Sequence, residues 1–161
     1  MSGADELLAA VRAGDVAAIE RLVAREPGLA AATDGGVSAV RIALYHRQPA
    51  ALAALLAAVP PLDGFDHAAL GWAADLERDL TADPGLTGAH AADGFTALHL
   101  AAFLGGPAAV RVLLEAGALE RQGPLRRLAP EQGEHRAGAG RAGDAGGIGA
   151  VVGAVVALLG G

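Results

Sequence analysis

The sequence contains no cysteine, no lysine and no asparagine, and only 3% of its residues are aromatic. Without cysteine the chain can form no disulfide bond, thiolate metal site or cysteine nucleophile. Without lysine it has neither a Walker-type phosphate-binding loop nor a residue for Schiff-base chemistry. A core with so few aromatic side chains must be built from Ala, Leu and Val, which suits close helix–helix contact better than a β-sandwich.

The charge of the chain is acidic and unevenly distributed. Residues 1–118 hold seven Arg and fourteen Asp or Glu, a net charge of −7, whereas residues 119–161 carry a net charge of +1. Because an acidic body repels phosphate backbones, we expect no nucleic-acid partner. The same charge favours a protein partner with a basic patch. Residues 1–6 lack the basic start and apolar run of a signal peptide, so we expect a cytoplasmic location.

A pattern of apolar residues recurs along the chain. On both sides of Gly105, apolar residues at spacings of three and four predict two short helices, and the Gly-Gly-Pro at 105–107 predicts the turn between them. The pattern recurs around Gly14, Arg47 and Gly71. The spacing from Gly14 to Arg47 is 33 residues, but the spacing from Arg47 to Gly71 is only 24, so the third copy is compressed. Four such units predict an all-α stacked solenoid.

Two details of these copies carry structural expectations. Asp79 falls on the core position that Leu22 holds in the first copy, so we expect the helix there to be rotated or partly exposed, since a buried unpaired Asp is costly. The first and third copies end in Pro-Gly-Leu, at 27–29 and 84–86. We expect the Pro to end the helix, the Gly to supply a left-handed turn and the Leu to fold back onto the last helical turn.

The stretch Asp-Gly-Phe-Thr-Ala-Leu-His-Leu-Ala-Ala at 93–102, with Gly105 and the Val-Arg-Val-Leu-Leu-Glu-Ala-Gly-Ala at 110–118, resembles the ankyrin-repeat signature. The one clear substitution is Ala97, where the family usually has Pro. A weaker version at 36–43 has Arg41 in place of the family's His. The resemblance covers residues 4–118 and implies an ankyrin-repeat solenoid of about four repeats with short β-hairpin-like loops, of a bacterial type. The absence of Lys and Asn, with abundant Ala and Gly, indicates a GC-rich coding sequence.

Single positions in the fourth copy have expected roles. Asp93-Gly94 predicts a tight turn at the tip of a hairpin-like loop, and Thr96 predicts a helix cap. His99 could be a ligand or a base, but the resemblance implies that it hydrogen-bonds the cap and the neighbouring loop instead. Trp72 follows a predicted turn, and we interpret it as a packing residue.

The resemblance implies that a partner meets the concave surface made by the loop tips and the exposed edges of the first helices. The matching positions in this sequence are Arg12, Ala13, Val37, Tyr45, His46, Ala69, Leu70, Asp93, Phe95, Phe103 and Leu104. Aromatic residues on an exposed strip are typical interface anchors. The alternative is that Tyr45, Phe95 and Phe103 only seal contacts between adjacent repeats.

No catalytic residue, cofactor or metal site is expected. Ser occurs only at positions 2 and 38, and neither lies in a nucleophile elbow. The acidic residues around His67 could form a carboxylate–His metal site, but a solvated acidic face is favoured because no second His is suitably spaced. These residues are Asp63, Asp66, Asp75, Glu77 and Asp79. The Gly-x-Gly-x-x-Gly at 138–143 follows no predicted strand. We therefore predict a non-catalytic protein-interaction scaffold.

Residues 119–161 do not continue the repeat pattern, and Gly supplies 11 of these 43 residues. One hypothesis is a shift of reading frame near codon 119, and another is disorder. Residues 145–161 are uncharged and contain a small-xxx-small pattern, so the alternative function is a membrane-tethered adaptor. A third possibility is a terminal helix that packs over the last repeat. Without a polar end cap, we expect Val110, Leu113 and Leu114 to expose an apolar end face.

Overall fold

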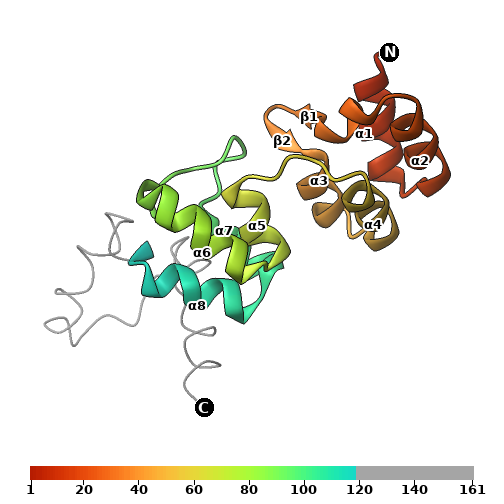
Figure 1. Ribbon diagram of the computed structural model, residues 1–161. Helices are drawn as coiled ribbons and strands as arrows, with labels where there is room; N and C mark the ends of the chain where they lie inside the picture. Colours follow the sequence, from red (N-terminus) through yellow and green to blue (C-terminus); the bar gives the residue numbers. More distant parts are fainter. Residues whose placement is uncertain (119–161) are drawn as a thin grey trace, which may run out of the picture.

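The computed structural model describes residues 1–118, which form eight α-helices arranged in four pairs (Figure 1). The interpretations of residues 119–161 as a frameshifted or disordered segment, a membrane tether or an end cap all lie outside the described residues. Within residues 1–118, no helix is both long and apolar enough to cross a membrane.

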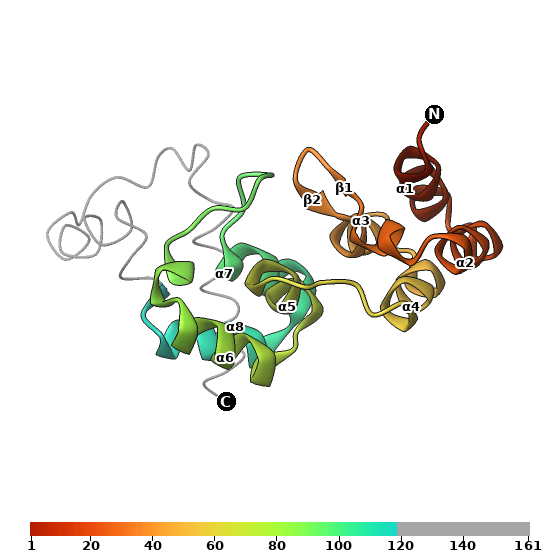
Figure 2. The ribbon, with the colours of Figure 1, turned by 45° about the horizontal axis from the view of Figure 1, so that its top comes forward.

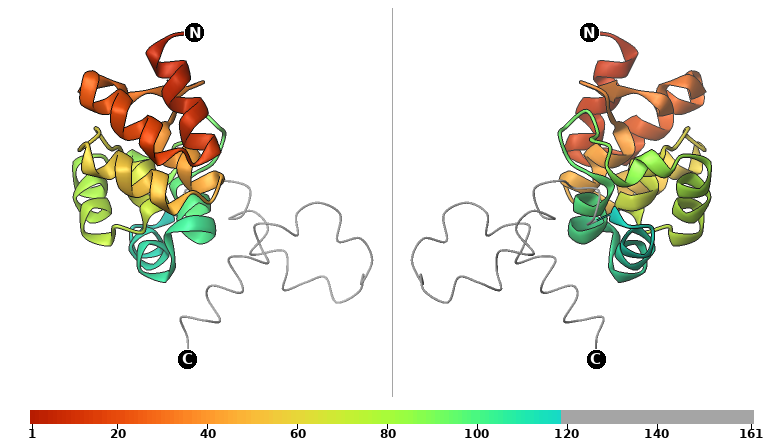
Figure 3. Two further views of the ribbon diagram at one scale, coloured as in Figure 1. Left: turned by 90° about the vertical axis from the view of Figure 1, so that its right-hand side faces the viewer. Right: turned by 90° about the vertical axis from the view of Figure 1, so that its left-hand side faces the viewer.

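The helices follow one another in the order expected for repeated pairs. Their bounds are α1 Gly3–Ala13, α2 Val16–Arg25, α3 Ala39–Tyr45, α4 Pro49–Ala57, α5 Gly64–Leu70, α6 Ala73–Ala82, α7 Ala97–Leu100 and α8 Pro107–Glu115. Three short helices complete the description, namely the 3-10 helices η1 Pro27–Ala31 and η2 Pro84–Thr87 and the π-helical turn η3 Ala101–Gly105. Viewed from either end of the array, successive pairs overlap (Figure 3). The all-α fold of four repeated pairs is confirmed.

The first helix of each pair begins at a capped turn. Ser2, Ser38, Asp63 and Thr96 each accept a hydrogen bond from the backbone N–H three residues further on. Such caps satisfy donors that a helix start otherwise leaves unpaired. The predicted cap at Thr96 is confirmed.

The turns between paired helices use left-handed backbone. Gly14 and Gly71 have φ values of 73° and 75°, and Arg47 at the matching position of the second pair has a φ of 53°. The alignment of these three residues is therefore confirmed. In the fourth pair the residue with positive φ is Gly106 rather than Gly105, because η3 inserts a wider turn before it.

Two hairpin-like loops project on the same side of the helices (Figure 2). The first finger, residues 33–38, pairs β1 Thr33–Asp34 with β2 Val37–Ser38 in antiparallel register. The second finger, residues 90–96, has a bridge between His90 and Thr96 and a turn in which Gly94 has a φ of 85°. The predicted hairpin-like loops are confirmed, including the tight turn at Asp93-Gly94.

The third pair has no finger, because residues 58–63 run to α5 without forming a strand. The absence of this finger accounts for the short spacing of 24 residues between Arg47 and Gly71. The two fingers are consequently neighbours: a Cβ built on Gly36 would lie 2.7 Å from the Cβ of Ala92.

The apolar core consists of two clusters rather than one. The first lies within the first two pairs and includes Leu7, Ile19 and Leu55. The second lies within the last two pairs and includes Leu76 and Leu100. The junction between the second and third pairs therefore falls between the two clusters.

Two sequence expectations are wrong. Neither Gly28 nor Gly85 has a positive φ. Each Pro-Gly-Leu instead forms a 3-10 helix, because the fixed φ of Pro suits the first position of a helical turn. Val110 and Leu113 do not expose an apolar end face, since both are buried in the second cluster, and Leu114 is half-buried against that cluster. The α8 face that carries them is turned toward α6 and α7.

The expectation for Asp79 is confirmed. Its side chain is 30% exposed, and a carboxylate oxygen lies 2.5 Å from the Nδ1 of His67. Leu80, one residue later, is buried in its place.

Trp72 stacks on the His67 ring at a centroid distance of 5.9 Å, although it is 39% exposed.

Candidate functional site

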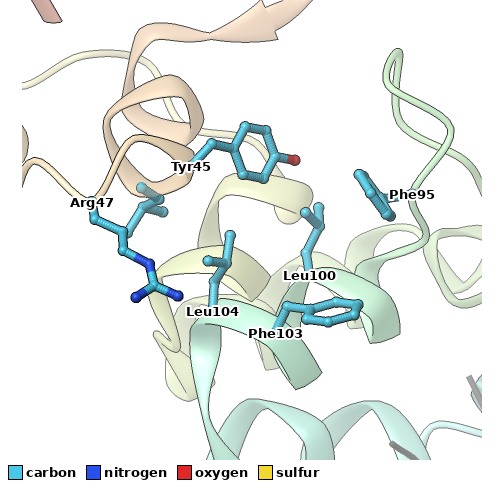
Figure 4. Close-up of a pocket in the computed structure, with 7 residues that line it drawn as sticks. Tyr45, Arg47, Phe95, Leu100, Phe103 and Leu104 are labelled. Atoms are coloured by element: carbon cyan, nitrogen blue, oxygen red, sulfur yellow. The ribbon is translucent and has the colours of Figure 1, made fainter. Parts of the chain in front are cut away.

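A pocket of about 580 Å³ lies between the end of α3 and the fourth pair (Figure 4). It is lined by Leu44, Tyr45, Arg47, Phe95, Leu100, Phe103 and Leu104. All of these residues belong to the second pair, the second finger or the fourth pair. The pocket therefore spans two repeats that are not consecutive, and its three Leu side chains all belong to or pack against the second core cluster.

Close backbone packing holds the fourth pair against α5. A Cβ on Gly105 would overlap the carbonyl oxygen of Ala68, and a Cβ on Gly71 would overlap the carbonyl oxygen of Gly105. Only glycine permits such an approach. Because η3 covers this part of α5, Ala69 is fully buried, and its expected place on the exposed strip is wrong.

Buried Arg41 connects the second pair to the third and fourth. Its Nε donates to Asp66 Oδ1 at 3.0 Å, its Nη1 to Asp93 Oδ2 at 3.4 Å and its Nη2 to the Gly36 carbonyl at 3.4 Å. The guanidinium carbon lies 6.0 Å from the centroid of the Phe65 ring. Arg41 therefore places the second finger relative to α3.

Asp66 is buried at the centre of this network. It accepts hydrogen bonds from the Ser38 hydroxyl at 2.6 Å and from Arg41 Nε. Burial raises the pKa of Asp66, and the Ser38 hydrogen bond opposes this rise. The expectation of a solvated acidic face is therefore wrong for Asp66. Within residues 1–118, no three His, Cys, Asp or Glu side chains group in a way that could hold a metal ion.

Tyr45 forms one wall of the pocket and is held in place by its hydroxyl. The Oη donates to Asp93 Oδ2 at 2.6 Å, and the ring centroid lies 6.4 Å from that of Phe95. Burial, together with the carboxylate of Asp93, raises the pKa of Tyr45. The phenol therefore stays protonated and keeps this hydrogen bond at neutral pH.

Phe95 is backed by the His99 ring, with 6.0 Å between the two centroids. His99 Nδ1 accepts from the Thr96 backbone N–H at 3.1 Å and lies 2.8 Å from the Thr96 hydroxyl. An accepting Nδ1 requires a neutral ring, and burial lowers the pKa of His99. The predicted cap role of His99 is confirmed.

Arg47 supplies the only charged side chain among the seven lining residues. It is exposed, and its backbone is left-handed. In the close-up its guanidinium extends along the pocket edge beside Leu104 (Figure 4). On the opposite side, Phe103 is 65% exposed.

The structure gathers some of the predicted strip residues and separates others. Tyr45, Phe95, Phe103 and Leu104 line the pocket, and Asp93 lies behind Tyr45. Val37 and Leu70 are half-buried against the first core cluster. Arg12 pairs with Asp34, and the exposed Ala13 and His46 lie at the ends of α1 and α3.

Sequence reasoning missed Leu44, Arg47 and Leu100 in the lining, as well as the Arg41–Asp66 pair. One signal was available for Arg47, because a charged residue there replaces the glycine of the matching turns. The Arg41 contacts had no local signal, since its partners lie 25 and 52 positions away in the sequence.

Comparison with known families agrees with this geometry. Residues 93–122 match the family model described as ankyrin repeat. The matched segment begins in the second finger and contains the capped α7, the glycine turn and α8. Among curated proteins, the comparison finds no match. Residues 93–122 thus carry an ankyrin repeat, and the four helix pairs and the fingers of the described residues are consistent with an ankyrin-repeat protein.

Proposed function

We propose that this chain is a non-catalytic scaffold that binds a segment of another protein in the pocket between its second and fourth pairs. Ankyrin repeats generally mediate protein–protein interaction. The observation that carries the proposal is the exposure of aromatic side chains around this pocket: Tyr45 is 38%, Phe95 39% and Phe103 65% exposed. Clustered exposed aromatic residues are typical of interfaces.

The pocket walls are organised before any partner arrives. Asp93 holds the Tyr45 hydroxyl, and the His99 ring supports Phe95. A partner therefore loses little affinity to the ordering of these side chains. The exposure of Phe103 also argues against the alternative that these aromatics only seal contacts between repeats.

The charge of the molecule adds a second component to the proposal. The net charge of −7 over residues 1–118 favours a partner with a basic patch through long-range attraction. Several of these acidic residues lie on the second helices of the pairs, namely Glu20, Asp75, Glu77, Asp79 and Glu115. We propose that these acidic residues steer a basic patch of the partner and that the pocket anchors a separate segment of the same partner.

Selection from a library of random 12-residue peptides displayed on phage tests the anchor. We expect the full-length chain to enrich peptides whose affinity falls at least tenfold in Phe103→Ala. The matched control is Trp72→Ala, an aromatic residue of 39% exposure outside the pocket, which should leave their affinity unchanged. Enriched peptides that bind both variants equally well, or no enrichment at all, would contradict the proposed site.

A further inference from the structure

Building on the proposed function, we infer that the pocket recognises an acidic peptide segment. A large apolar side chain of the segment enters the pocket, and an Asp or Glu within two residues of it pairs with Arg47. The inference rests on the lining of the pocket, on the pairing of the charges around it and on the backbone of Arg47.

The lining defines the apolar part of the ligand. Six of the seven lining residues are uncharged, and they comprise three aromatic and three Leu side chains. The volume of about 580 Å³ is within the range of pockets that enclose small organic groups, about 300–1,000 Å³. The pocket can therefore take a Phe, Trp or Leu side chain of a partner.

The pairing of charges defines the acidic part of the ligand. Arg12 pairs with Asp34, and Arg41 pairs with Asp66 and Asp93. Within residues 1–118, Arg47 makes no such pair, although it stands at the pocket edge. A guanidinium offers five N–H donors, which match a carboxylate in a two-pronged hydrogen bond.

The backbone of Arg47, together with the position of its side chain at the pocket edge, supports a role for this side chain. The matching turn residues of the first and third pairs are Gly14 and Gly71, which adopt the left-handed conformation without strain. Arg47 adopts it at a cost, and strained residues that are not glycine cluster at ligand sites. The chain keeps an arginine where glycine fits the turn better.

Asp93, the acidic residue that bonds to the lining residue Tyr45, does not favour a basic ligand. Asp93 Oδ2 accepts from the Tyr45 hydroxyl and from Arg41 Nη1, and its side chain is 14% exposed. Its charge is therefore directed into the buried network. A basic peptide would find no carboxylate in the lining and would meet Arg47 with like charge.

The sequences of the peptides enriched in the phage selection test the inference. We expect the enriched peptides to contain Phe, Trp or Leu with an Asp or Glu within two positions of it. Their affinities are then measured on synthetic 12-residue peptides. The affinity of these peptides for the Arg47→Glu variant should be about tenfold or more below their affinity for the wild type. Replacing the acidic residue of the peptide with Gln should lower its affinity for the wild type by a similar factor. Arg111→Glu, a reversal at an exposed Arg on α8, should leave the affinity unchanged.

The outcomes separate this inference from the proposed function. Peptides that depend on Phe103 but carry Lys or Arg beside the apolar residue, or that bind Arg47→Glu as tightly as wild type, would overturn the acidic ligand and leave the pocket as the site. Peptides that are insensitive to Phe103→Ala would overturn both. If Arg47→Glu lowers the melting temperature, Arg47→Gln provides the same comparison without charge reversal and should retain the loss for acidic peptides.

Discussion

Arg41, Asp66 and His99 occupy the same position in three successive repeats, the third residue after the helix cap. His99 and Asp66 pair with the cap residue in the same way, whereas Arg41 does not. His99 accepts from the cap's own backbone N–H, and Asp66 does the same for Asp63. Arg41 has no acceptor, so the Ser38 cap turns its hydroxyl to Asp66 and Arg41 donates to the same carboxylate.

The neutral His99 makes the stability of the fold depend on pH. Burial lowers its folded-state pKa below the ordinary value of 6.5, so below about pH 6.5 the unfolded chain takes up a proton that the folded chain resists. We expect the free energy of unfolding to fall as the pH drops through this window and to show no contribution from His99 above about pH 7.

Urea titrations between pH 5 and 8 measure this dependence. The control is His99→Asn, whose amide oxygen can accept from the Thr96 N–H but does not titrate. In this variant the free energy of unfolding should depend on pH much less steeply than in the wild type. An unchanged slope would assign the pH dependence to other groups.

Val59 offers a test of backbone strain away from the pocket. It has a φ of 51° and is 84% exposed, at the end of α4. A left-handed β-branched residue costs roughly 1–2 kcal/mol, and the exposed side chain recovers little by packing. We expect Val59→Gly to raise the free energy of unfolding by about 1 kcal/mol in urea denaturation. Ala53→Gly, on an exposed turn inside α4, should instead lower it by about 1 kcal/mol.

At the residue scale, local pairings were predictable and distant ones were not. Thr96 and His99 lie three positions apart, so cap and partner can be seen in the sequence together. Tyr45 and Asp93 are 48 positions apart. Their contact is possible because the third pair has no finger, so that the second finger lies beside the second pair.

The contact between α5 and η3 depends on two glycines at the scale of elements. Because a Cβ on Gly105 would overlap the Ala68 carbonyl, Gly105→Ala must push the fourth pair away from the third. We expect a loss of about 2–3 kcal/mol in the free energy of unfolding by urea, as for an overpacked core. Gly28→Ala is the matched control, since no atom lies within 4 Å of its built Cβ and its φ is not positive, and it should be close to neutral. Equal stabilities of the two variants would contradict this packing argument.

Helix pairs were predictable because apolar spacing and turn glycines are local signals. The 3-10 helices after α2 and α6 were not, because Pro-Gly is compatible with either a left-handed turn or a short helical turn. The π-helical turn η3 packs closely against α5, and no local pattern in the sequence marks it. Its position could therefore be found only in the folded chain.

On the scale of the whole molecule, buried polar contacts add to the apolar contacts of Leu44 and Leu70 in joining two apolar clusters. The first cluster ends at the second pair and the second begins at the third, while Arg41 bonds across the boundary to Asp66 and Asp93. In a solenoid, stability is the sum of repeats and their interfaces, so a weak interface can uncouple the halves.

We expect Arg41→Met to separate the unfolding of the two halves. In urea, fluorescence of Trp72, the only tryptophan, reports on the second half, while circular dichroism at about 222 nm reports on all helices. The two transitions should coincide in the wild type and diverge in the variant, because a buried Asp66 loses its partner, a change that costs about 3–5 kcal/mol in buried pairs. Arg12→Met, which removes the exposed pair with Asp34, should keep them coincident. Coincident transitions in Arg41→Met would show that apolar contacts alone couple the halves.

The missing third finger also changes how the array can be read by a long partner. Along a regular array, a ligand that contacts one finger per repeat advances by the same step each time. Here the fingers precede the second and fourth pairs only, and they lie close together at Gly36 and Ala92. A regular array would have a third finger between them, before the third pair. A ligand whose contact points match evenly spaced fingers would contact the first finger but would not be in register with the second. We therefore expect the shortened repeat to disfavour partners whose contact points are evenly spaced, whatever side chains those partners carry.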